Sequence, residues 1–252
     1  MTLYIIGLGL YDEQDITVRG FGLAKQCDEV FLENYTSKMI CSIDRLSEVY
    51  GRRVRPAFRQ KLENTDELID LARTKKVALL IMGDPFSATT HIDLIMRARK
   101  KGVEVKVIHN ASVLNAVGAT GLQLYKFGRT TSIPFPDDNP DAEAYYDIVK
   151  ANQSIDAHTL ILLDLNPDDD RFMTVNDAIR NLQKIELKRN EKVFRGDTLC
   201  IGCARLGWTE QKIVFGKASD LLKEDFGAPP HCLIIPSKLH FAEEEFLQQF
   251  RR

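Results

Sequence analysis

The chain has 252 residues, of which 44% are hydrophobic and 28% are charged. That length suits one large α/β domain or two smaller ones, and the composition excludes an intrinsically disordered chain. Thirty-four basic and 36 acidic side chains leave a formal net charge of −2, which argues against a general nucleic-acid-binding protein.

The apolar runs of the chain are short. Residues 77–82 and 160–163 are the strongest, and both are far too short to span a bilayer. Residues 3–10 are apolar but lack the basic start and the cleavage site of a secretory leader. Five cysteines, an odd number, indicate free thiols in a reducing compartment. We therefore expect a cytoplasmic protein that does not bind membranes.

Short apolar runs alternate with helical patterns in the first half. We expect strands over residues 3–8, 29–32, 77–82 and 103–108. We expect helices over residues 15–27, 42–50, 65–75 and 89–101, with Asp15 and Asn64 as caps and Gly51 and Gly102 as stops. Strands separated by single helices predict a mostly parallel sheet, and ligands bind beyond the carboxyl ends of such strands. The candidate ligand loops are residues 7–12, 83–90 and 109–115.

The pattern changes after about residue 112. Strands are expected over residues 159–163, 198–204, 212–215 and 232–235, and one long helix over 174–188, capped by Thr174 and Asp177. Strands at closer spacing with fewer helices predict a mixed sheet. The expected organisation is an N-terminal α/β domain over residues 1–112 and a C-terminal α/β domain over residues 113–252.

A Gly-x-Gly pattern, Gly7 and Gly9, directly follows the first expected strand. Glycine there lets the backbone approach a ligand closely. The dinucleotide fingerprint requires glycine or alanine three residues after Gly9, where this chain has Asp12. A nicotinamide oxidoreductase is therefore disfavoured, and a plain tight turn remains an equal alternative.

The loop that begins with Gly83 is more informative. It follows a strongly apolar strand, so Asp84 is expected at the mouth of the sheet, where it can accept hydrogen bonds from a ligand amine or ribose hydroxyl. Alternatively, Asp84 bonds the amides of its own loop. Small residues after the next strand, Ala111 and Ser112 among them, leave close space for a ligand, although a plain strand-to-helix junction is also consistent.

Cys200 and Cys203 have the spacing of a metal-ligand pair. They lie on an expected strand, where residues three apart point to opposite faces. No second cysteine or histidine pair follows, so we predict no metal.

Several stretches match one known family in order along nearly the whole chain. They are residues 3–12 with 15–17, 33–37, 83–91, 118–128, 223–231 and 236–240. With these residues the chain resembles the diphthine synthase family of the tetrapyrrole methylase superfamily. The Gly-Asp-Pro loop is typical of the superfamily, whereas the Tyr-Lys-Phe-Gly stretch at 125–128 and the Glu-Asp-Phe-Gly-x-Pro-Pro-His stretch at 224–231 indicate the narrower family.

The resemblance implies two α/β domains, the first with a mostly parallel sheet and the second with a mixed sheet, and a homodimer. It implies that the methyl donor S-adenosyl-L-methionine binds in the cleft between the domains. Carried over by position, the donor contacts are Leu10, Asp84, Ser87, Ser112, Val113, Leu163, Ala204 and His231. The residue patterns alone had pointed to the first three loops, but not to Leu163 or Ala204.

The implied reaction is repeated methylation of the amino group of 2-(3-amino-3-carboxypropyl)histidine on translation elongation factor 2, which gives diphthine and S-adenosyl-L-homocysteine. No catalytic base can be named from the sequence, and our hypothesis is that no single side chain is indispensable as acid or base. The alternatives are another methylase of the superfamily, with a corrin or ribosomal-RNA substrate, and a non-catalytic nucleotide-binding module.

Overall fold

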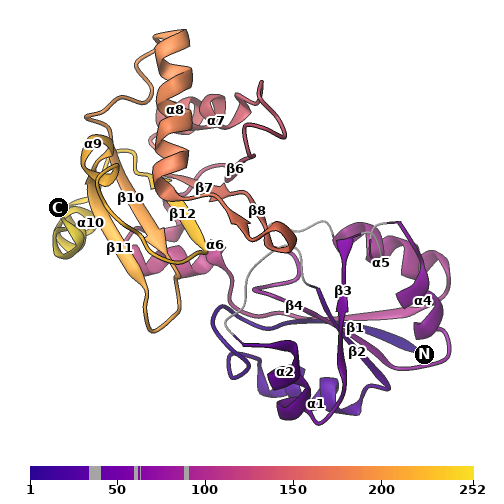
Figure 1. Cartoon of the computed structure of the whole chain (residues 1–252). Coiled ribbons are helices and arrows are strands. Elements are labelled where there is room, and N and C mark those ends of the chain that lie inside the picture. Colours follow the sequence, from indigo (N-terminus) through magenta and orange to yellow (C-terminus); the bar gives the residue numbers. More distant parts are fainter. Residues whose placement is uncertain (34–40, 60–61, 63, 88–90) are drawn as a thin grey trace. The chain divides into compact units, whose positions relative to one another are not determined.

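The computed structural model describes residues 1–33, 41–59, 62, 64–87 and 91–252 (Figure 1). These residues form two compact units, Met1–Ala116 and Val117–Arg252, called unit 1 and unit 2 below. In the described part of the chain, no helix has both the length and the apolar character needed to cross a membrane.

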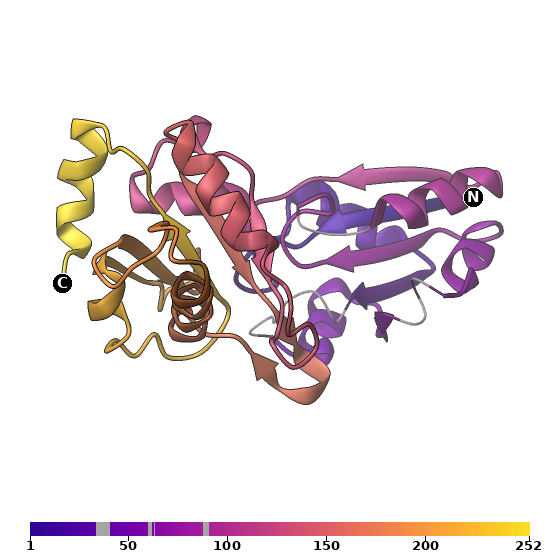
Figure 2. The ribbon, with the colours of Figure 1, turned by 90° about the horizontal axis from the view of Figure 1, so that it is seen from above.

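Unit 1 is built on a five-stranded parallel sheet, as predicted, with the order β3-β2-β4-β1-β5. Figure 2 shows its strand arrows running in the same direction. The strands are β1 (Thr2–Gly7), β2 (Glu29–Glu33), β3 (Val54–Ala57), β4 (Val77–Ile81) and β5 (Glu104–Ile108). The helices are α1 (Val18–Gln26), α2 (Ile43–Tyr50), α4 (Glu67–Ala72), α5 (His91–Lys100) and α6 (Val113–Ala116).

Alternation along β1 divides the core of unit 1 between the two faces of the sheet. Leu3 and Ile5 pack with the side chains of α4 and α5, while Tyr4 and Ile6 pack with those of α1 and α2. Figure 1 shows these two helix pairs on opposite sides of the sheet. Because β1 lies between β4 and β5, the loops that follow these three strands emerge side by side at one edge.

Two predicted helix starts in unit 1 are wrong, while both predicted stops are confirmed. Helix α1 is capped by Thr17, whose hydroxyl accepts from the Gly20 amide at 3.0 Å, and not by Asp15. Helix α4 begins at Glu67 after Asp66, so Asn64 does not cap it. Gly51 and Gly102 have φ angles of +61° and +71°, left-handed values that favour glycine after a helix. The predicted start of α5 includes residues 89 and 90, which lie outside the described residues.

Unit 2 contains a mixed five-stranded sheet, as predicted, with the order β11-β10-β12-β7-β6. Only β6 and β7 pair in parallel. The strands are β6 (Thr131–Ile133), β7 (Thr159–Leu163), β10 (Leu199–Ala204), β11 (Lys212–Lys217) and β12 (His231–Ile235), with a small hairpin of β8 (Leu165–Asn166) and β9 (Arg171–Phe172). The helices are α7 (Ala144–Ser154), α8 (Val175–Arg189), α9 (Ala218–Leu221) and α10 (Phe241–Leu247).

The long helix α8 begins with the predicted capping box. The Thr174 hydroxyl accepts from the Asp177 amide at 3.2 Å, and the Asp177 carboxylate accepts from the Thr174 amide at 3.0 Å. One face of α8 packs Val175, Ile179 and Leu182 into the same core cluster as the side chains of α7 and of one face of the sheet.

A buried carboxylate fastens α10 to the segment after residue 120. Glu243 is 1% exposed and accepts from the amides of Gln123 at 2.9 Å and His240 at 2.7 Å. It also accepts from the ammonium of Lys126 at 2.6 Å and the Nε2 of His158 at 3.2 Å. The Ser237 amide donates to the Nδ1 of His158, so the proton of that imidazole lies on Nε2, facing Glu243. This cluster, called the Glu243 cluster below, joins two of the stretches that carry the family resemblance, residues 118–128 and 236–240.

Candidate functional site

The loops after β1 and β4 are joined by two backbone hydrogen bonds. Gly83 N donates to Gly9 O at 2.7 Å, and Gly9 N donates to Gly83 O at 3.3 Å. Their φ angles of +86° at Gly9 and +72° at Gly83 are left-handed, which explains glycine at both positions. The loop after β1, which contains the Gly-x-Gly pattern, and the loop after β4 are therefore joined beyond the ends of their strands. These two loops and the loop after β5 are called the three-loop platform below.

Asp15 shapes the first of these loops. Its carboxylate accepts from the amides of Leu10 at 3.0 Å and Tyr11 at 2.8 Å. The side chain of Asn110, in the loop after β5, donates to the carbonyl oxygens of Gly7 and Asp15, both at 3.0 Å. These bonds fix the backbone at Leu10, the first of the predicted donor contacts, and they tie the third loop to the first. Neither Asp15 nor Asn110 was assigned this role from the sequence.

Asp84 lies at the centre of the three loops and is 8% exposed. One carboxylate oxygen accepts from the Phe86 amide at 2.9 Å, and the other from the Asn110 amide at 3.1 Å and from His109 Nδ1 at 2.8 Å. Burial raises the pKa of Asp84, but the hydrogen bonds from Phe86, His109 and Asn110 outweigh it and hold the pKa below its usual value. Asp84 is thus ionised and accepts hydrogen bonds from its own loop, as one of the two interpretations of the sequence proposed. It also accepts hydrogen bonds from the loop after β5.

The remaining predicted residues of unit 1, Ser87, Ser112 and Val113, belong to the loops after β4 and β5 or directly follow them. The Ser112 hydroxyl donates to the Ser87 hydroxyl at 3.0 Å, so the loops after β4 and β5 also meet there. Ser112 is buried, and its amide donates to the side chain of Asn115 at 2.8 Å. Val113 is the first residue of the short helix α6 and is partly exposed. The structure therefore brings Ser87 and Ser112 together.

The three predicted residues of unit 2 lie at one edge of its sheet. Ala204 is the last residue of β10 and pairs with His231, the first residue of β12. On the other side of β12, Cys232 pairs with Leu162, so Leu163 ends β7 at the same edge. Ala204 and Leu163 are buried, which leaves mainly their backbone groups for a contact with a ligand.

His231 carries an unused acceptor at this edge. Its Nε2 lies 3.1 Å from the carbonyl oxygen of Ala228, which can only accept, so Nε2 carries the proton. Its Nδ1 is buried without a hydrogen-bond partner among the described residues. Burial lowers the pKa of His231, and the neighbouring Arg205 lowers it further, which favours the neutral ring. A neutral ring with a bare Nδ1 can accept a hydrogen bond from a ligand amino group.

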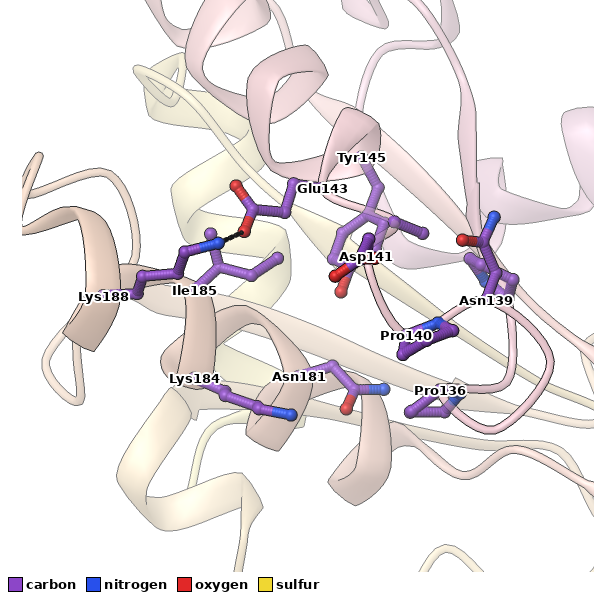
Figure 3. A pocket seen from close by; sticks show the side chains of 12 residues that line it. Pro136, Asn139, Pro140, Asp141, Glu143, Tyr145, Asn181, Lys184, Ile185 and Lys188 are labelled. Atoms are coloured by element: carbon purple, nitrogen blue, oxygen red, sulfur yellow. Dashed lines mark hydrogen bonds and ion pairs between the residues drawn. The ribbon is translucent and has the colours of Figure 1, made fainter.

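A separate cavity of about 210 Å³ lies between α8 and the loop before α7 (Figure 3). Its lining combines prolines and Tyr145 with the polar side chains of Asn181 and Lys184, and Lys188 pairs with Glu143 at 2.6 Å on its border. None of the eight predicted donor contacts lines it. The cavity is therefore distinct from the edge that carries Leu163, Ala204 and His231.

Cys200 and Cys203 both lie on β10, as predicted, and point to opposite faces. Cys200 belongs to the core cluster that includes α8, whereas Cys203 pairs with Cys232 across the β10–β12 ladder, and the neighbouring Cys232 thiol and burial raise the pKa of Cys203. All five cysteines are free thiols.

The close contact of the first two loops gives a stability prediction. A Cβ at Gly7 would lie 2.6 Å from Gly83 O, so Gly7→Ala is expected to destabilise the protein by about 1–3 kcal/mol. The matched control is Gly22→Ala in α1, where a Cβ meets nothing within 4 Å, and which is expected to stabilise by roughly 0.5–1 kcal/mol. Urea unfolding gives the free energy of unfolding of both variants. Equal effects of the two substitutions would contradict the close contact of the two loops.

Comparisons with known proteins identify the family that has this architecture. The family model "Tetrapyrrole (Corrin/Porphyrin) Methylases" matches residues 2–222. The chain is 45% identical to a diphthine synthase of Methanococcus maripaludis, over 98% of this chain and 97% of the relative. It is 43% identical to a diphthine methyl ester synthase of Dictyostelium discoideum, over 100% and 98% of the two chains. The crystal structure of a putative diphthine synthase from Entamoeba histolytica is 46% identical, with a TM-score of 0.93, and the match covers 100% of this chain and 98% of that one.

The parallel sheet with its glycine-joined loops and the mixed second sheet thus define a member of the tetrapyrrole methylase family. Within that family, the chain belongs to the diphthine synthases.

Proposed function

We propose that this protein is a diphthine synthase that transfers methyl groups from S-adenosyl-L-methionine to the amino group of 2-(3-amino-3-carboxypropyl)histidine on translation elongation factor 2. The observation that carries the proposal is 45% identity to a diphthine synthase over nearly the whole of both chains. The match covers both units, and so includes all eight of the predicted donor contacts.

The residues present fit the proposed donor, which has an adenine amino group, two ribose hydroxyls and a cationic sulfonium centre. The ionised Asp84 favours a cation near the loops of unit 1. The unused Nδ1 of His231 can accept from an amino group such as that of adenine. Ser87, Ser112 and Ala204 are small enough for the donor to approach the backbone closely. Leu10, Val113 and Leu163 complete the proposed set of contacts.

The proposed reaction is an in-line displacement at a methyl group that the bound donor supplies in activated form. The nitrogen of the acceptor attacks the methyl carbon, the carbon–sulfur bond breaks, and its electron pair remains on sulfur. The protein contributes alignment of nitrogen, carbon and sulfur and exclusion of water. The fixed backbone at Leu10 and the Asp84 anchor are the groups in unit 1 that provide such alignment.

The elongation factor as protein substrate, a homodimer and a cytoplasmic location are parts of the same proposal. The five free thiols support a reducing compartment. The net charge of −2 supports a protein acceptor over RNA. A corrin or ribosomal-RNA methylase and a non-catalytic nucleotide-binding module remain the alternatives.

An acceptor screen with methyl-labelled donor tests this proposal. We expect label on elongation factor 2 that carries the unmethylated histidine intermediate, and none on the unmodified factor, on ribosomal RNA or on a corrin precursor. Label on RNA or corrin would contradict the proposed substrate. Calorimetric binding of S-adenosyl-L-homocysteine without transfer to any acceptor would favour the binding module.

A further inference from the structure

His109 stands beside Asp84 with one nitrogen unused. It is the first residue after β5, and its Nδ1 lies 2.8 Å from the Oδ2 of Asp84. The side chain of His109 is 64% exposed, whereas that of Asp84 is 11% exposed. No other residue in the described part of unit 1 makes a hydrogen bond with the imidazole, and the largely exposed ring leaves Nε2 open to a ligand.

The proton on this imidazole has a defined position. A carboxylate with a lowered pKa only accepts hydrogen bonds, so Nδ1 of His109 donates to Asp84 and the lone pair lies on Nε2. The amides of Phe86 and Asn110 hold the carboxylate itself, which prevents it from turning away. The result is a histidine oriented by a fixed aspartate, an arrangement that supports proton transfer at the outer nitrogen.

An exposed aromatic ring lies next to the imidazole. The ring of Phe86 is 5.6 Å from that of His109, at an interplanar angle of 56°, and Phe86 is 45% exposed. An ammonium group beside an aromatic ring is attracted by the ring quadrupole, and methylated ammonium groups favour such positions. The neighbourhood of Nε2 therefore suits an amine that becomes progressively methylated.

We propose that His109 is the general base of the methyl transfer and that Asp84 is the residue that positions it. This inference rests on the proposed function. The acceptor enters as an ammonium ion, and Nε2 takes one of its protons, which leaves a neutral amine and an imidazolium. The amine then attacks the methyl carbon, and the carbon–sulfur electron pair stays on sulfur. The imidazolium returns its proton to solvent, to which His109 is open.

The charges around His109 favour this proton movement. Asp84 faces the ring from the loop after β4 and stabilises the imidazolium. Asp15, in the loop after β1, is joined to the neighbouring Asn110, and its carboxylate already accepts from Leu10 and Tyr11. Lys106 of β5 pairs with Glu104. Among the described residues, Asp84 is thus the charged group in direct contact with the ring.

The test compares His109→Gln with the wild-type enzyme and with Lys106→Gln, an exposed control on β5. Turnover at saturating donor and acceptor is measured from pH 6 to 10, and S-adenosyl-L-homocysteine affinity by calorimetry. We expect His109→Gln to lose about 100-fold or more in kcat near neutral pH while its affinity stays within a few-fold of wild type. The deficit should shrink at high pH, where the acceptor amine is already neutral, and free imidazole should partly restore His109→Ala.

Two results would overturn the inference. One is a wild-type rate for His109→Gln across the pH range. The other is a loss that is equal at every pH and that imidazole does not relieve, since that pattern belongs to a merely structural role. Failure of the proposed function itself is distinguishable, because then the wild-type protein would transfer no methyl group to the elongation factor at any pH.

Discussion

Glu243→Ala is expected to lower the free energy of unfolding by about 3–5 kcal/mol, because the substitution removes the common hydrogen-bond acceptor of a buried ionic cluster. The amides of Gln123 and His240, the ammonium of Lys126 and the imidazole of His158 all donate to this one carboxylate. Without it, buried donors lose their partners and a lysine loses its counter-ion. Urea unfolding followed by circular dichroism measures the change.

Glu244→Ala is the matched control for this substitution. Glu244 is the next residue of α10 and is exposed, so its removal is expected to change stability by less than about 0.5 kcal/mol. Equal effects of the two substitutions would show that the Glu243 cluster does not hold α10 in place.

The same cluster predicts a dependence of stability on pH. Burial raises the pKa of Glu243, but its hydrogen bonds outweigh this and lower the pKa from 4.5 to about 2. A carboxylate with a depressed folded-state pKa stabilises the fold above the unfolded pKa, and that contribution is lost as pH falls. For Glu243, a contribution of roughly 3 kcal/mol is expected above pH 4.5, declining toward pH 2. Burial also lowers the pKa of His158. The stability of the fold is therefore expected to fall further as pH drops below 6.5, the ordinary pKa of a histidine.

Asp84→Ala is expected to reduce kcat/KM for methyl transfer by at least about 100-fold. The substitution removes the acceptor of two backbone amides and of His109, and each unsatisfied buried donor costs about 1–3 kcal/mol. The loops after β4 and β5 then lose the group that holds them together, and His109 loses its orientation. Steady-state kinetics with the elongation factor intermediate measure the effect.

Asp93→Asn is the control for Asp84. Asp93 lies on α5 of the same unit, and its side chain is 66% exposed and pairs with Arg97 at 2.7 Å. Loss of such a surface pair costs about 0–1 kcal/mol and is expected to leave turnover unchanged. Wild-type kinetics for Asp84→Ala would contradict the account of the three-loop platform.

Much of the fold follows from local sequence patterns. The strands β1, β2, β4 and β5 were predicted because they are short apolar runs, and Gly102 marks the end of the helix that precedes β5. The mixed sheet of unit 2 was predicted from closer strand spacing. Strand β3 was not predicted, because Pro56 and Arg55 disfavour a strand and the run of arginines before Pro56 is typical of a solvent-exposed face. β3 is tolerated as an edge strand, where Arg55 pairs with Glu29 of β2 at 2.7 Å.

The site was predictable only as a set of loops. The strand–loop pattern indicated where Asp84 and Ser112 would lie, since the carboxyl ends of parallel strands share one edge. It did not indicate that Asp15 holds the Leu10 amide instead of capping α1, because the choice between two nearby caps depends on contacts outside the helix. The contact between Asp84 and His109 joins residues 25 positions apart, which no local pattern encodes. Helix α7 and the β8–β9 hairpin were likewise not predicted.

The most direct test of the proposed function is the intact mass of elongation factor 2 carrying the unmethylated intermediate, measured before and after incubation with this protein and S-adenosyl-L-methionine. We expect the factor to gain whole methyl groups, the gain to map to the modified histidine, and Asp84→Ala to abolish most of it. An unchanged mass, with the protein folded and S-adenosyl-L-homocysteine bound, would contradict the proposed function.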